Sequence, residues 1–128
     1  MTYVTFKPGW KAAPAATKRN SEYHPSVDIV ETGEAYALEF DLPGFTKEDI
    51  KVAVDEGVLK VSGERKRNVE RDERYYRHFE RPEGMFNRSF KLPDHVDGES
   101  IKATYTHGVL RLELPKKEEA KPRTIEIK

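Results

Sequence analysis

The feature that most constrains the fold is an alternation of apolar and polar residues that recurs along most of the chain. Leu110, Leu112 and Leu114, for example, alternate with Arg111 and Glu113. Successive side chains of a β-strand point to opposite faces, so a period of two is typical of a strand with one buried face. The alternation predicts strands over residues 27–31, 36–40, 50–54, 58–61, 86–92, 101–105 and 110–114.

Turn-forming residues separate these runs. Glu56-Gly57 and His107-Gly108 each stand between two alternating runs, which predicts a tight turn at each of them. Thr46, followed by two acidic residues, predicts a cap on one short helical turn. Short strands with turn signals about every ten residues are typical of a β-sandwich, and no helix of useful length is expected.

The charge balance argues against a nucleic-acid partner. Lys and Arg together number 23, as do Asp and Glu, so the formal net charge is zero. Phosphate binding favours a basic surplus, and the basic run at residues 65–67 is diluted by nearby acidic residues. Charged residues make up 36% of the chain. So many charges would keep a protein with sticky apolar patches in solution, but an ordinary solvated surface would explain them as well. There is no cysteine, so no disulfide framework is expected.

Residues 1–24 differ from the strands that follow. Val4, Phe6 and Trp10 are apolar, but they stand among prolines, a glycine and alanines without a sustained period. The segment is therefore interpreted as a flexible N-terminal arm. The first residues lack the apolar core of a signal peptide, and no apolar run reaches the roughly 18 residues of a membrane span, so we expect a cytoplasmic protein without a membrane partner.

Residues 64–83 interrupt the alternation. They hold thirteen charged residues together with Tyr75, Tyr76 and Phe79. One interpretation is a solvated loop. The other is a loop that reaches onto another subunit, because aromatic side chains favour burial and a long structureless loop is uncommon in a compact domain.

The last residues combine a charged, proline-containing stretch at 116–123 with two isoleucines, Ile125 and Ile127. The stretch is interpreted as a flexible tether. Two residues spaced by two share one face of an extended strand. They could form a last strand of the same domain or dock onto an apolar groove of another subunit, since the ten residues from Leu114 to Ile125 span roughly 33 Å when extended.

No catalytic or metal site is expected. His24, His78, His95 and His107 show no spacing typical of metal ligands, and no cysteine accompanies them. The serines lack the G-x-S-x-G turn of hydrolases, and the chain lacks a G-x-x-x-x-G-K-[ST] phosphate loop. The sequence therefore predicts no enzyme, no cofactor and no small-molecule substrate.

Four motifs occur in a fixed order. Residues 41–50 contain DLPGF and EDI, residues 86–93 read FNRSFKLP, residues 108–116 read GVLRLELPK, and residues 125–127 read IEI. Together they resemble the small heat-shock protein family (Hsp20, alpha-crystallin domain) of bacterial type. The resemblance implies an immunoglobulin-like two-sheet β-sandwich at residues 25–116, between the arm at 1–24, which is short for the family, and a C-terminal extension at 117–128.

The resemblance also implies where subunits meet. The long loop of bacterial-type members carries a strand that pairs with the first strand of a partner, here residues 75–80 against 27–31. The residues of this dimer contact would be Tyr75, Tyr76, Phe79, Val27, Ile29 and Arg88. The isoleucines of the tail, Ile125 and Ile127, would fill a groove, which would be formed here by Ile50, Val52, Val54, Ile101 and Ala103.

Arg88 shares its parity with the apolar residues Phe86 and Phe90. A guanidinium forced into a partly buried place needs a carboxylate partner. The alternative is an arginine whose charged head reaches solvent, and the sequence leaves both open.

The function implied by the resemblance is that of an ATP-independent chaperone, a holdase that binds unfolding proteins and prevents their aggregation during heat or other stress. Its partners would be copies of itself, as dimers and higher homo-oligomers, and unfolded client proteins. Val4, Phe6 and Trp10 of the arm, and the groove once the tail has left it, are expected to contact clients. The alternative is a co-chaperone-like scaffold that binds one specific partner.

Overall fold

The computed structural model describes residues 23–65, 77, 78, 80–82 and 84–128. Outside this range lie six residues singled out from the sequence, namely Val4, Phe6, Trp10, Tyr75, Tyr76 and Phe79.

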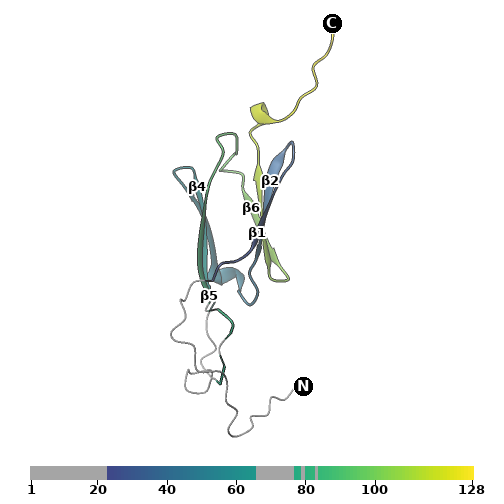
Figure 1. The fold of residues 1–128 in the computed structure, drawn as a ribbon. Helices are drawn as coiled ribbons and strands as arrows, with labels where there is room; N and C mark the ends of the chain where they lie inside the picture. The colour runs from purple at the N-terminus through teal and green to yellow at the C-terminus, as the bar shows by residue number, and fades with distance from the viewer. Residues whose placement is uncertain (1–22, 66–76, 79, 83) are drawn as a thin grey trace.

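In the described part of the chain, antiparallel strands form two sheets, which confirms the predicted all-β sandwich. The larger sheet has the order β1-β2-β7-β6 and the smaller one the order β3-β4-β5. Figure 1 shows the sheets edge-on, with β4 and β5 in one layer and β1, β2 and β6 in the other. The strands are β1 (Val27–Glu31), β2 (Ala35–Asp41), β3 (Ile50–Asp55), β4 (Val58–Arg65), β5 (Gly84–Lys91), β6 (Lys102–Thr106) and β7 (Val109–Pro115), and two short 3-10 turns are η1 (Lys47–Asp49) and η3 (Glu118–Ala120).

Tight turns connect β3 to β4 and β6 to β7, where the sequence predicted them. Glu56 and Gly57 have φ angles of 49° and 75°, and His107 and Gly108 have φ angles of 54° and 77°. Two successive positive φ angles are the geometry of the type I′ turn, whose twist matches that of the flanking strands. Strand β4 runs two residues further than the loop boundary at residue 64 suggested, because Glu64 and Arg65 still pair with β5.

The core lies between the sheets and is made of the inward-facing residues of the alternating runs. On β7 the three leucines are buried, whereas Arg111 and Glu113 are exposed. The rings of Phe45 and Phe86 meet edge to face at 5.3 Å between centroids, a favourable aromatic geometry. The buried apolar residues are Leu38, Phe40, Leu42, Phe45, Leu59, Val61, Phe86, Val96, Leu110, Leu112 and Leu114.

One open side of the sandwich, between edge strands β1 and β5, is crossed by the residues just before β1. The Tyr23 N–H donates to the Met85 carbonyl of β5 (2.6 Å), and the Tyr23 hydroxyl donates to the Asp41 carbonyl of β2 (2.9 Å). Pro25 is fully buried, and the Asp41 N–H donates to the Ser26 carbonyl (3.1 Å). These contacts tie the two sheets together on this side.

Gly63 on β4 lies where two neighbouring strands approach closely. It pairs with Ile50 on β3 and with Phe86 on β5. A Cβ added there would lie 2.6 Å from the Asp49 carbonyl oxygen and 2.8 Å from a ring carbon of Phe86. Any larger residue therefore displaces backbone or a buried ring.

We expect Gly63→Ala to lower the free energy of unfolding by about 1–3 kcal/mol, because the added methyl group overpacks the core. Denaturant unfolding at a fixed subunit concentration measures this value. The matched control is Gly98→Ala, whose Cβ would meet only Val54 at 3.8 Å and should leave stability unchanged or slightly raised. Equal losses in the two variants would contradict the explanation.

Candidate functional site: a groove between two edge strands

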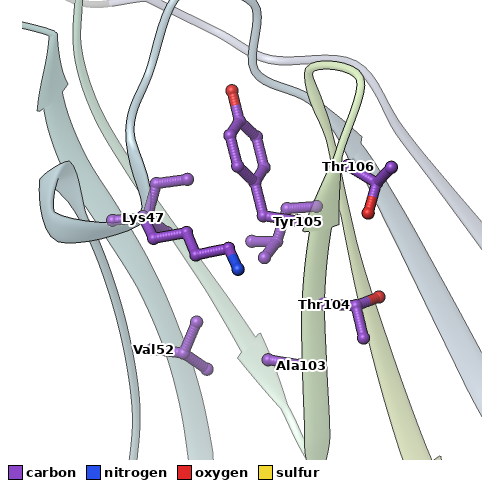
Figure 2. Close-up of a pocket in the computed structure, with 8 residues that line it drawn as sticks. Lys47, Val52, Ala103, Thr104, Tyr105 and Thr106 are labelled. Atoms are coloured by element: carbon purple, nitrogen blue, oxygen red, sulfur yellow. The ribbon is translucent and has the colours of Figure 1, made fainter.

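A groove opens on the other side of the sandwich, between β3 and β6, which are edge strands of the two sheets. Its volume is about 380 Å³, within the range of roughly 300–1,000 Å³ that is typical of ligand pockets. Figure 2 shows the side chains of Lys47, Val52, Ala103 and Tyr105 in the space between the two strands, whereas Thr104 and Thr106 project to the other side of β6. They belong to Lys47, Ile50, Val52, Ala103, Thr104, Tyr105, Thr106 and Leu110.

The floor of the groove is apolar because the alternation of both edge strands continues into it. Ile50 and Val52 on β3 are half-buried and pack against the core. Ala103 on β6 shares the parity of Tyr105, which also packs against the core, yet Ala103 is exposed. An inward-facing alanine is exposed only where nothing covers it, so the groove is an uncovered part of the core.

Hydrogen bonds fix the walls of the groove. The Tyr105 hydroxyl donates to the Leu42 carbonyl, and the Leu42 N–H donates to the Gly108 carbonyl (2.7 Å). The short turn predicted after Thr46 is η1, and the Thr46 N–H donates to the Asp49 carboxylate across 3.0 Å. Because its hydroxyl is already bonded within the domain, Tyr105 presents mainly its ring to an occupant.

The groove contains three of the five residues that the family resemblance indicated, namely Ile50, Val52 and Ala103. Val54 and Ile101 are not among the lining residues, since Val54 is exposed further along β3 and Ile101 packs against the core just before β6. Of the other lining residues, Thr104 and Tyr105 lie in the groove strand predicted at residues 101–105 but were not named individually, and Lys47, Thr106 and Leu110 lie outside both predicted groove strands. Parity could have identified Tyr105, but Lys47 lies in a turn, where no period gives the direction of a side chain.

The two isoleucines of the tail lie far out in solvent. Ile125 is 81% exposed and Ile127 is 95% exposed. Figure 1 shows the extension leaving the end of β7 and running away from both sheets. The alternative of a last strand within the same domain does not describe this structure, because residues 117–128 contain η3 and no strand.

The first residues of the extension are fastened to the domain. The Lys116 N–H donates to the Glu34 carbonyl (2.8 Å), and the Lys117 N–H donates to the His95 carbonyl (2.7 Å). The Lys116 ammonium donates to the Glu31 carboxylate across 2.9 Å, and this hydrogen bond lowers the pKa of Glu31 below its ordinary value. The stretch interpreted from the sequence as a tether therefore begins with two residues, Lys116 and Lys117, that are held against the domain by hydrogen bonds.

Contacts with the domain continue beyond η3. A Cβ added at Gly33, in the turn between β1 and β2, would lie 3.0 Å from the Pro122 ring, so the two residues are close neighbours. Within η3 and its cap, the Lys121 ammonium donates to the Glu118 carboxylate (2.9 Å), which raises the pKa of Lys121. From Pro122 onward the residues of the extension are exposed.

The edge strand β1 carries the other candidate contact. Val27 packs partly against the core, whereas Ile29 and Val30 are 55% and 53% exposed. The Arg88 guanidinium on β5 donates to the Pro25 carbonyl (3.1 Å) and lies 5.3 Å from the centre of the Phe90 ring. Among the described residues, Arg88 thus contacts a carbonyl and a ring, and the carboxylate partner that was one of the two alternatives from the sequence is not found there.

Neither a cluster of metal ligands nor a membrane-spanning helix occurs in the part of the chain that the structure describes. Among them, no three His, Cys, Asp or Glu side chains gather in a way that could hold a metal ion. No helix within the described ranges has the length and apolar character needed to cross a membrane.

The chain matches a known protein family over most of its length. Residues 28–128 match the family model described as Hsp20/alpha crystallin family. Small heat shock protein C2 of Rickettsia felis is 35% identical over 90% of this chain and 75% of its own length. The 18.1 kDa class I heat shock protein of Arabidopsis thaliana is 42% identical over 95% of this chain and 78% of its own length.

The structural comparison agrees. A small heat-shock protein from Xylella fastidiosa, whose crystal structure is described as revealing a distinct high order structure, superimposes with a TM-score of 0.70 at 39% identity. The match covers 83% of this chain and 97% of that protein. These relatives support a chaperone role and self-association. The chain belongs to the Hsp20/alpha-crystallin family of small heat shock proteins.

Proposed function

We propose that this protein is an ATP-independent holdase that binds unfolding proteins and prevents their aggregation during heat or other stress. The observation that carries the proposal is the apolar groove between β3 and β6, which is uncovered while the Ile125 and Ile127 side chains of the same chain are exposed. The chain thus holds both an open apolar site and an apolar segment of matching character.

The groove suits an extended segment. Both of its flanking strands lie at the edge of their sheets, so each has one side without a neighbouring strand among the described residues. An extended chain added there gains backbone hydrogen bonds from an edge strand and contacts for every second side chain with the floor. Ile50, Val52 and Ala103 supply that floor.

The tail has the properties of such a segment. Ile125 and Ile127 are spaced by two and therefore share one face when the tail is extended. In the proposal, the tail of one subunit docks in the groove of another, and its departure frees the groove for a client. Burial of each isoleucine side chain in the groove contributes about 1.5–3 kcal/mol to the free energy of docking.

A second self-contact belongs to the proposal. Strand β1 is an apolar edge with Ile29 and Val30 exposed, and such edges require a cover to avoid aggregation. We infer that residues 75–80 of a partner subunit add to this edge, with Tyr75, Tyr76 and Phe79 facing Val27, Ile29 and Arg88. The resulting dimer would be the unit that the tails link into larger assemblies.

The mechanism requires no chemical step. Unfolding proteins expose apolar surface and aggregate through encounters with one another, so capping that surface slows their aggregation. Capping is a binding equilibrium, and the chain has no phosphate loop for ATP. The arm residues Val4, Phe6 and Trp10 are proposed as additional client contacts, and a cytoplasmic setting remains part of the proposal.

The first test heats a thermolabile protein with and without this chain, in the absence of nucleotide, and records light scattering. We expect roughly equimolar chaperone to suppress the scattering. Ala103→Glu, which places a carboxylate on the exposed floor, should weaken the suppression, and Ser89→Glu on the exposed face of β5 is the matched control. Unchanged scattering at a large excess would contradict general chaperone activity and favour a scaffold that serves one partner.

The second test replaces the tail anchors. We expect Ile125→Ala/Ile127→Ala to reduce the mass of the assembly, because each truncation removes most of the apolar surface that docks. Size-exclusion chromatography with light scattering measures the mass. Thr124→Ala, on the opposite face of the extended tail, should leave the mass unchanged. A double variant with the mass of the wild type would show that the tail does not link subunits.

A further inference from the structure

The groove contains a charge that its apolar character does not explain. Among its eight lining residues in the described chain, Lys47 is the charged one. Figure 2 shows the Lys47 side chain extending into the space between β3 and β6, with its nitrogen directed toward the groove. The ammonium therefore lies where the backbone or side chains of an occupant would pass.

This ammonium has no carboxylate partner within the described domain. The ion pairs of lysine and arginine among the described residues involve Lys60, Arg111, Lys116 and Lys121, and none of them involves Lys47. An occupant that covers the groove would remove water from the Lys47 ammonium. A charge that loses water without gaining a partner opposes binding, so the best occupant brings a carboxylate.

The tail brings a carboxylate in a suitable place. Glu126 stands between Ile125 and Ile127, whereas the other charged residues near them, Arg123 and Lys128, are basic. When the isoleucines face the floor, Glu126 points the other way, toward the open side of the groove, because successive side chains alternate. Lys47 approaches that space from η1, on one side of the groove.

We propose that Lys47 pairs with Glu126 of a docked tail from a second copy of this chain. Lys47 is thereby a specificity-determining residue, since it favours extended segments with a carboxylate between two apolar side chains over segments with a basic residue there. This inference rests on the docking of the tail put forward under the proposed function. The isoleucines supply most of the affinity, and the charge pair selects among apolar segments.

The expected effect per contact is modest. A partly exposed ion pair changes a dissociation constant by about two- to fivefold. An assembly held by many tails amplifies such a change, because each tail that stays docked keeps the others close to their grooves. Reversing one charge replaces attraction with repulsion, so its effect should exceed that of neutralisation.

The experiment uses the full chain with three changes, namely Lys47→Glu, Glu126→Lys and the two combined. We expect each single reversal to raise the subunit concentration at which the assembly dissociates, and the combined variant to recover most of the wild-type value. Dilution series followed by light scattering measure this concentration at low and high salt. The effect of the single reversals should shrink at high salt, where charges are screened.

Two controls separate charge from packing. Lys51→Glu makes the same change of charge on the exposed face of β3, outside the groove lining, and should leave the dissociation concentration unchanged. Lys47→Met keeps an unbranched apolar side chain without the charge, so it should accept Glu126 and Glu126→Lys tails about equally well.

The outcomes distinguish this inference from the docking itself. If the single reversals have no effect while Ile125→Ala/Ile127→Ala lowers the mass, the tail docks but the charge pair is wrong. If the single reversals weaken the assembly and their combination does not recover it, Lys47 and Glu126 do not pair. If the isoleucine variant also leaves the mass unchanged, the docking and this inference fail together.

Discussion

The structure depends on the burial of one face of every central strand against the opposite sheet. Phe40, Leu59, Val61 and Leu112 are fully buried between the layers, and burial of such a side chain contributes about 1.5–3 kcal/mol. Strands that face each other in this way bury their inner faces but leave edges on both sides of the sandwich. The surfaces available for binding are therefore at the edges, where core residues come within reach of other chains.

The two sides of the sandwich differ because the chain crosses one of them. Tyr23 and Pro25 lie across the side between β1 and β5 and bond to both sheets. On the side of β3 and β6, no described segment takes this position, so Ala103 stays exposed although it faces inward. The groove is thus a consequence of topology, and the apolar character of its floor follows from the same alternation that builds the core.

Much of this fold could be predicted from the sequence, since alternation marks strands such as Leu110–Leu112–Leu114 and the Gly57 and Gly108 turns mark the hairpins. Alternation does not say which strands pair, so the contact of β2 with β7 had to come from the structure. The same limit explains the groove. Ala103 and Val52 become neighbours only when the sheets stack, and Lys47 reaches them from a turn without periodicity.

The fastening of the C-terminal extension has a consequence for the architecture of any assembly. If Pro122 stays against Gly33, only Arg123 and Thr124 separate the fixed point from Ile125, and these three Cα–Cα steps span about 10 Å when extended. If tails link subunits as proposed, the extension then acts as a spacer of fixed start and short reach, and each linked neighbour must lie at nearly the same offset. Links of one length and direction favour closed shells of uniform size over polydisperse clusters.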